Sequence, residues 1–358
     1  MLNIKFLKNN SIFDFLVSLF LSHIYYKITF VNSLETDFAL IDQIRFGSIS
    51  SQSFFVESPT FTFISLLLGI ESLDIFKILV YLVTVGSLFL IAVNVQHLNE
   101  YSTLFMLSGW LISCSWFVGF VDIISVLLMV LISKNIIENK ITIRMTFLYF
   151  LLLCLNHNAI SFGVSLIYLI LAKKEFFYKL LSLIVSTQII GNLLINLYLN
   201  KYNFSGRGRF RFVFNDNVIE SATNFVGSNL LVILWSGFFG SSIVFILLFN
   251  LISWTKTKKI LISVLICLFF TSIALDTSRV FSLLIVPIII YTLDIYKKFT
   301  NFDNKLSITY TSTIFLILLI GVYHFFGVTK TSSPNNNIEN FYDFIPRIIN
   351  SIMSNIWK

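Results

Sequence analysis

Residues 76–95 read FKILVYLVTVGSLFLIAVNV, and this stretch decides the class of fold. It holds one charged side chain, Lys77, close to its start. A helix needs about 20 predominantly apolar residues to cross a bilayer, so the stretch predicts a membrane-spanning helix. The rest of the chain has the same character, because only 12% of its 358 residues are charged and 56% are hydrophobic. Soluble domains carry about 25% charged residues, and the composition therefore indicates an integral membrane protein.

Apolar runs on both sides of this stretch predict further helices. Four runs have the length of one span: residues 12–31, 180–199, 229–254 and 307–326. Residues 61–70 are too few to cross and predict an interfacial or re-entrant helix. Three runs are interrupted by polar residues: 104–132 at 119–122, 145–172 at 156–158, and 260–295 at 276–279. Each interrupted run is either one long span or a hairpin of two short helices.

The distribution of basic residues decides between these two alternatives. Lys and Arg accumulate in the cytoplasmic loops of membrane proteins. If the interrupted runs are hairpins, five basic clusters fall on the cytoplasmic side: residues 5–8, 134–144, 173–179, 256–259 and 297–305. If they are single spans, the clusters alternate between the two sides. The sequence therefore predicts an all-α polytopic membrane protein with about eleven transmembrane helices, a cytoplasmic N-terminus and one larger outer loop at about residues 200–227.

The same observations predict the domain organisation and argue against a nucleic-acid partner and a metal site. We expect a single membrane domain over residues 1–326 and a polar outer tail, weakly amphipathic at its end, over residues 327–358. The net charge of +7 does not indicate a nucleic-acid partner, because most Lys and Arg lie in the short loops that orient helices. Cys114, Cys154 and Cys267 lie inside apolar runs without metal-ligand spacing. We read them as buried hydrophobic residues and expect no metal and no cofactor.

The hairpin topology places the unusual polar residues together on the outer side, where they predict one cavity. Glu35 and Asp37 point the same way at strand spacing and form either a general base, a metal site or a solvated acidic loop. Asp122 follows the break at Gly119 and either caps a helix or belongs to the site. His157 lies between two asparagines and is either a base, a proton relay, a hydrogen-bond donor to a phosphate or part of a polar turn.

Two further candidates carry arginine. Asp276 and Arg279 are three positions apart, so they either face the cavity or form an ion pair within their own turn. Residues 206–212 read GRGRFRF. In this stretch, Arg207, Arg209 and Arg211 alternate with other residues at the period of a strand, which turns the three guanidinium groups to one side. We call these three residues the basic strip. It forms either a site for an anionic ligand or a flexible loop.

The order of these motifs resembles the GT-C glycosyltransferase architecture. The resemblance rests on an acidic motif after the first helix, a proline-led juxtamembrane helix, the break GFVD at 119–122, a hairpin with a polar tip, and DTSR at 276–279. The size of the chain, its richness in Phe and Ile, and its one larger outer loop also resemble O-antigen and capsular polysaccharide polymerases. One departure is that Asn156 and His157 stand where many GT-C enzymes carry Lys or Arg.

Both resemblances imply the transfer of a sugar or oligosaccharide from a polyprenyl phosphate or diphosphate carrier on the outer face of a bacterial inner membrane. A multi-pass polymerase of this kind would use lipid-linked glycan as substrate, with a flippase and a chain-length regulator as partners. The resemblance implies that Asp37, Glu35 and His157 are catalytic. It also implies substrate-binding roles for the basic strip, Arg279, Asp122 and Asp276. The alternatives are a GT-C transferase that adds one sugar, and a lipid-oligosaccharide flippase, which predicts internal repeats and charges at mid-membrane depth.

Overall fold

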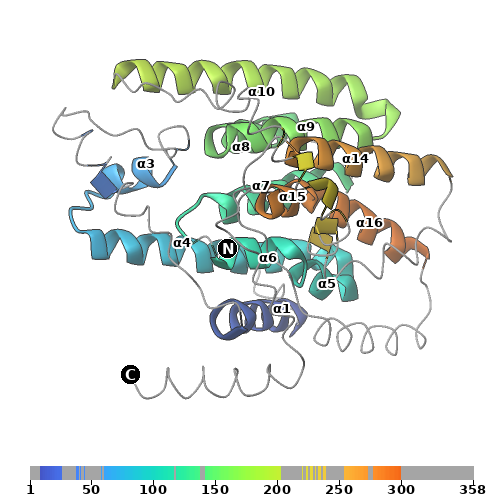
Figure 1. Cartoon of the computed structure of the whole chain (residues 1–358), viewed down its shortest axis with the longest axis horizontal. Coiled ribbons are helices and arrows are strands. Elements are labelled where there is room, and N and C mark those ends of the chain that lie inside the picture. The colour runs from blue at the N-terminus through green and yellow to red at the C-terminus, as the bar shows by residue number, and fades with distance from the viewer. Residues whose placement is uncertain are drawn as a thin grey trace.

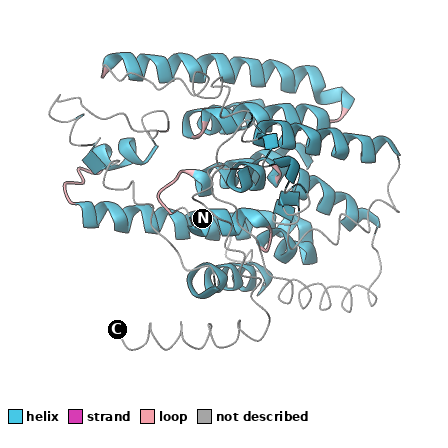
Figure 2. Ribbon diagram, in the orientation of Figure 1, coloured by secondary structure: helices cyan, strands magenta, loops and turns pink. Residues whose placement is uncertain are grey.

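The computed structural model is all-helical over the residues that it describes (Figure 1, Figure 2). It describes residues 9–25, 58, 60–116, 118–137, 142–202, 254–272 and 277–299, with scattered positions in 38–44 and 220–238. Within those ranges the only β-type pairing is an isolated bridge between Val118 and Phe120. The predicted all-α class is confirmed.

The described helices follow the apolar runs of the sequence closely. Their bounds are α1 Asn9–Phe20, η2 Leu21–Tyr25, α3 Thr60–Leu67, α4 Leu73–Asn94, η4 Val95–Tyr101, α5 Ser102–Met106, α6 Gly109–Trp116, α7 Asp122–Ile137, α8 Ile143–Asn156, α9 Asn158–Leu171, α10 Lys174–Lys201, α14 Trp254–Ser272, α15 Thr277–Leu284 and α16 Val286–Phe299. Two helical stretches are long and apolar enough to cross a membrane, Leu73–Asn99 and Lys174–Lys201. In Figure 1, α10 and α1 lie along opposite edges of the bundle.

The run at 145–172 folds back on itself as a hairpin. His157 separates α8 from α9 with the non-helical angles φ −152° and ψ 80°. The rings of Phe150 in α8 and Tyr168 in α9 then pack edge to face, with centroids 5.7 Å apart. In one continuous helix these residues would lie about 27 Å apart, so the two helices must run in opposite directions.

The other two interrupted runs pack against each other. Tyr101 packs on Tyr296 with ring centroids 5.2 Å apart, and Ser113 bonds Ser282 at 2.6 Å. The chain from α5 through α6 therefore runs antiparallel to α15 and α16. At the start of α14, Lys259 donates a hydrogen bond to the carbonyl of Ala172 at the end of α9.

Hydrogen bonds of lysines gather at one end of this bundle, which we call the lysine end. Lys134 donates to Asn94 Oδ1 at 3.2 Å, and Lys297 donates to the carbonyl of His97 at 2.6 Å. Lys259 Nζ of α14 lies 2.6 Å from the carbonyl oxygen of Ala172, the residue directly after α9, and this contact joins the two helices. The described residues of the three interruptions, Asp122, His157 and Arg279, lie together at the other end of α7, which we call the break end.

The outer helices bury their polar side chains and expose their apolar ones. On α1, Asp14 is 0% exposed and Phe13 is 57% exposed. The buried face of α1 comprises Ser11, Asp14 and Ser18 and continues with Ser22 in η2, and the exposed face comprises Ile12, Phe13, Leu16 and Phe20. On α14, Thr257, Ser263 and Thr271 are buried beside Ile260 and Cys267, and Leu261, Ile262, Leu265 and Phe269 are exposed. A helix on the surface of a water-soluble domain has the opposite arrangement.

Close backbone contact holds α10 against α8. Gly191 faces Cys154 so tightly that a Cβ atom placed on the glycine would lie 2.5 Å from Cys154 Sγ. All three cysteines are buried and form no disulfide, as expected for small core residues. The contact between α8 and α10 fixes the hairpin tip at His157 beside the C-terminal half of α10.

Candidate functional site

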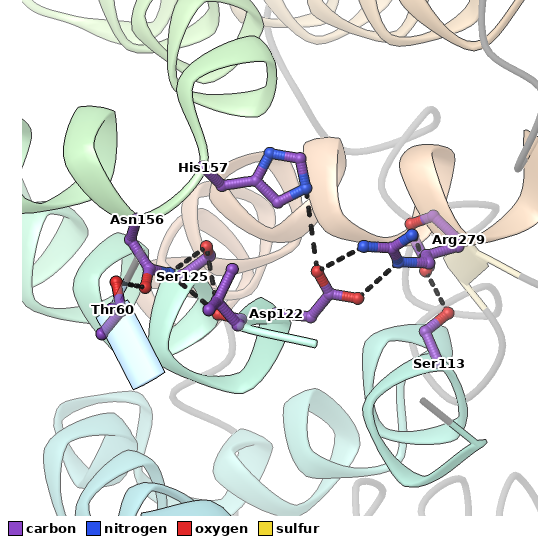
Figure 3. A network of polar contacts seen from close by, with 9 residues as sticks. Thr60, Ser113, Asp122, Ser125, Asn156, His157 and Arg279 are labelled. Atoms are coloured by element: carbon purple, nitrogen blue, oxygen red, sulfur yellow. Dashed lines mark hydrogen bonds and ion pairs between the residues drawn. The ribbon is translucent and has the colours of Figure 1, made fainter. Parts of the chain in front are cut away.

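Three interrupted runs, far apart in the sequence, meet at one cluster of charged side chains (Figure 3). Asp122 is the first residue of α7, Arg279 lies in the first turn of α15, and His157 is the residue between α8 and α9. Asp122 and Arg279 are separated by 157 positions in the chain. We call these three residues the break-end cluster.

Asp122 and Arg279 form a buried, two-point ion pair. Arg279 donates from Nε to Asp122 Oδ2 at 2.6 Å and from Nη2 to Asp122 Oδ1 at 3.1 Å. Asp122 is 0% exposed and Arg279 is 8% exposed. This geometry uses the planar fork of the guanidinium group, which matches the two oxygens of a carboxylate. The pair ties the α7 hairpin to the α15 hairpin without leaving either charge uncompensated.

The chain before Asp122 is shaped to receive the guanidinium group. The carbon of that group lies 3.8 Å from the centre of the Phe120 ring, which is a cation–π contact. Gly119 adopts φ +119°, a backbone conformation that side-chain-bearing residues rarely occupy. The glycine therefore permits the sharp turn that brings both Phe120 and Asp122 to the same arginine.

His157 approaches the other side of the carboxylate. Its Nε2 atom lies 3.8 Å from Asp122 Oδ1, and the residue is 7% exposed. A protonated imidazole at this distance is attracted by the carboxylate, whereas a neutral one is not an ionic partner. With His157 neutral the cluster has no net charge, and with His157 protonated it carries one positive charge.

Asn156 fastens the hairpin tip to the α7 break. Its Nδ2 donates to the carbonyl of Val121 and to Ser125 Oγ, both at 2.8 Å. Its Oδ1 accepts a hydrogen bond from Thr60 Oγ1 at 2.7 Å, so the start of α3 joins the same network. The position of His157 is therefore set by its neighbour, which holds three segments together.

A pair of hydroxyl groups supports Arg279 from the opposite side. Ser282 Oγ donates to the carbonyl of Arg279 at 2.9 Å and bonds Ser113 Oγ of α6 at 2.6 Å. Both serines are buried. The backbone of Arg279 is thus anchored to α6, and its side chain to α7.

The structure brings together three of the expected site residues and leaves the others undescribed. Asp122, His157 and Arg279 lie together, whereas the single outer cavity stays a prediction. Glu35, Asp37, Asp276 and the basic strip lie outside the described residues. Arg279 pairs with Asp122, and an ion pair within the 276–279 turn stays a prediction because Asp276 lies outside the described residues. In the part of the chain that the structure describes, no group of three potential ligands is placed to hold a metal ion.

One buried carboxylate was not singled out by the sequence analysis. Asp14 accepts hydrogen bonds from the hydroxyl groups of Ser102 and Thr103 and from Gln96 Nε2, the last at 3.1 Å. The available signal was that Asp14 is the only acidic residue in the run at 12–31, with serines at helical spacing on the same face. This cluster lies towards the lysine end and not at the break end.

A comparison of the chain with protein-family models, with curated proteins and with solved structures gives no match. Fold and site together define an all-helical bundle with apolar outer faces and a buried charged cluster at one end.

Proposed function

We propose that the protein is a multi-pass glycan polymerase of a bacterial inner membrane. It would join oligosaccharide repeat units carried on polyprenyl diphosphate, on the periplasmic face. The observation that carries the proposal is the meeting of Asp122, His157 and Arg279 from three separate hairpins. Ionisable residues at membrane depth are costly and concentrate where a membrane protein performs its function.

Membrane insertion with about eleven spans is part of this proposal. Its support is that the exposed faces of α1 and α14 are apolar. Lipid tails accept such faces, whereas water does not. The lysine end corresponds to the cytoplasm, because basic residues accumulate there. The break end then faces the periplasm, where the lipid-linked units are joined.

The transfer requires a base, an anion-binding group and a leaving group. A hydroxyl oxygen of the acceptor glycan attacks the anomeric carbon of the donor and forms the new C–O bond. The bond from that carbon to the diphosphate breaks, and its electron pair leaves with the polyprenyl diphosphate. The hydroxyl proton passes to a carboxylate, for which we propose Asp37, assisted by Glu35. His157 stands ready to relay that proton, since a histidine exchanges protons near neutral pH.

The geometry refines the proposed roles of the arginines. Asp122 occupies two nitrogens of Arg279, so we assign the diphosphate first to the basic strip. Arginine suits this task because its fork binds two phosphate oxygens and keeps its charge at any working pH. Arg279 and Asp122 then act as the rigid wall of the cavity. Asp276 remains a proposed substrate-binding residue, and a flippase and a chain-length regulator remain the proposed partners.

Replacement of the proposed base tests this function. In a strain whose surface polymer depends on this gene, Asp37→Asn should abolish the polymer ladder on a gel and leave single repeat units on the lipid carrier. The amount of protein in the membrane should stay normal, because the change removes a base and not a packing contact. The matched control is Asp42→Asn, which changes another acidic residue five positions further along the chain. A protein with this change should still polymerise the glycan normally.

Other outcomes would contradict the proposed base or identify one of the alternative functions. A full ladder from Asp37→Asn would contradict the proposed base. If the wild-type protein adds only one sugar to a lipid carrier, it is a single-sugar transferase of the GT-C kind. If it moves lipid-linked units across the membrane without joining them, it is a flippase, and the proposed function is wrong.

A further inference from the structure

The C-terminal half of α10 carries a row of carboxamide side chains that the proposed reaction does not use. Gln188, Asn192, Asn196 and Asn200 follow one another at intervals of four residues, so they lie on one face of the helix. We call these four residues the amide stripe. They span about 18 Å along the helix axis.

The amide stripe faces outward from the bundle. Asn192, Asn196 and Asn200 are exposed, and Gln188 is half-buried. The neighbouring exposed side chains of α10 are large and apolar: Ile189, Leu193 and Leu197. No charged residue lies between Lys179 and Lys201. A carboxamide turned towards lipid tails loses its hydrogen bonds to water, so its presence on this helix calls for a polar partner.

Hydrogen bonds connect the amide stripe to Asn158 and Ser161, at the start of α9 beside the break-end cluster. Asn158, the residue after His157, donates from Nδ2 to Asn192 Oδ1 at 2.7 Å. Gln188 Nε2 donates to Ser161 Oγ at 3.0 Å, and Ser161 Oγ donates to the carbonyl of Asn158 at 2.7 Å. The stripe therefore starts beside the proposed reaction site and continues away from it along α10.

The chemistry of the stripe selects one part of the proposed substrate. A carboxamide offers two donors and one acceptor oxygen and carries no charge. The polyprenyl tail is apolar and forms no hydrogen bonds, and the diphosphate is best held by cations. Glycan hydroxyl and acetamido groups both donate and accept without charge, which matches a row of carboxamides. A stripe of several amides along one line also suits a linear ligand of several units.

We propose that the amide stripe is a binding track for the glycan chain, which holds the growing saccharide as it leaves the reaction site. This assignment rests on the proposed function, because it takes its ligand from the proposed polymer. It predicts that the stripe acts on chain length and not on the formation of the first linkage. A chain that stays bound is extended again, and a chain that dissociates remains short.

The double variant Asn196→Ala/Asn200→Ala tests the track. These two residues lie farthest from the break-end cluster, so their loss leaves the hydrogen bonds of Asn158, Gln188 and Asn192 in place. Loss of two neutral hydrogen bonds should weaken chain retention by about tenfold. The polymer ladder should shift to short chains, while the amount of the first dimer of repeat units stays at the wild-type level. The matched control Leu193→Ala/Leu197→Ala changes the same turns of α10 on another face and should keep the wild-type ladder.

A second measurement separates glycan from protein as the occupant. A photo-reactive amino acid at position 196 should yield, on irradiation of membranes, an adduct that stains for carbohydrate. An adduct with another membrane protein and no carbohydrate would overturn the track in favour of a helix interface. A wild-type ladder from Asn196→Ala/Asn200→Ala would also overturn it. If the wild-type protein makes no polymer at all, the proposed function is wrong, and the track is not what failed.

Discussion

The carboxylate of Asp122 has two nitrogen-bearing neighbours, Arg279 and His157, and only the arginine is permanently charged. Arg279 donates two hydrogen bonds to it, and His157 lies 3.8 Å away. A buried charge whose partner is removed costs far more than the pair contributes when intact. The stability of the break end therefore depends on keeping the pair complete and not on either residue alone.

A double-mutant cycle measures this dependence. Asp122→Leu should destabilise the folded protein by about 3–5 kcal/mol, because it leaves a buried guanidinium group without its carboxylate. Arg279→Met should do the same to Asp122. The double variant Asp122→Leu/Arg279→Met should be less destabilised than either single variant, since it removes both charges. Thermal unfolding of the purified protein in detergent gives the comparison through the shift in Tm.

Additive losses in that cycle would contradict the ion pair. Ser133→Ala at the other end of α7 is a suitable control background. It removes a hydroxyl contact with Tyr168, and its effect should add to that of Asp122→Leu.

For single residues, the sequence predicted which residues belong to the break-end cluster better than it predicted which of them contact one another. Asp122, His157 and Arg279 were identifiable because each interrupts an apolar run. Their meeting was predicted from topology, but the pair of Asp122 with Arg279 was not. Local spacing suggested Asp276 as an acid for Arg279, and the pair of Arg279 with Asp122, 157 positions away, was not anticipated. Local spacing contains no information about such a contact, because packing of whole helices creates it.

At the scale of elements, the contact of α8 with α10 depends on the absence of a side chain. A Cβ atom placed on Gly191 would lie 2.5 Å from the sulfur of Cys154 and 3.0 Å from the Cβ of Cys154, so it would collide with both. Because interiors are closely packed, such a collision must separate the helices or displace Cys154. The tip of the α8–α9 hairpin would move with them.

Gly191→Ala should therefore destabilise the protein by about 1–3 kcal/mol, the usual range for overpacking. Adding Cys154→Ala should restore part of the loss, because it removes the sulfur that the new methyl group meets. Gly86→Ala is the control, since a Cβ atom there meets nothing within 4 Å. Thermal unfolding in detergent again provides the measurement, and equal Tm values for Gly191→Ala and Gly86→Ala would contradict the close contact.

The helices themselves were largely predictable. α4 and α10 were expected from continuous apolar runs of spanning length, and α3 from a run too short to span. The turn at 107–108 between α5 and α6 was missed, because the residues there, Leu107 and Ser108, fit an apolar helix as well as a turn. The η4 segment was also missed. It contains Asn99 at φ 55°, a conformation that depends on its surroundings and leaves little trace in the sequence.

At the scale of the whole molecule, the two ends of the bundle differ in charge. Lys134, Lys259 and Lys297 contact backbone or amide oxygens at the lysine end, and the break-end cluster lies at the other. The sequence predicted this separation from the distribution of basic residues. The apolar exposed faces of α1 and α14 could not be read from hydropathy alone, because the neighbours of each helix are known only in the folded bundle.

Labelling of single cysteines tests the proposed orientation. After replacement of the three native cysteines, cysteines introduced at Gly206 and Ser278 should react with a membrane-impermeant maleimide added to intact cells without an outer membrane. Cysteines at Lys140, Lys174 and Lys258 should react only after the inner membrane is opened, because basic residues are expected on the cytoplasmic side. Labelling of Ser278→Cys only from the inside would show that the run at 260–295 is not a hairpin with an outer tip.

The buried face of α1 has a consequence for how the chain enters a membrane during synthesis. Asp14 finds its hydroxyl partners 88 and 89 residues further along the chain, at Ser102 and Thr103. At a synthesis rate of about 5–20 residues per second, α1 exists for roughly 4–18 seconds before those partners are made. During that time its carboxylate, which lies towards the lysine end, has neither of these hydroxyl partners. On the proposed membrane topology, we therefore expect the insertion machinery to shelter the first helix until α5 is made, so that its release into lipid is timed by a helix that follows it.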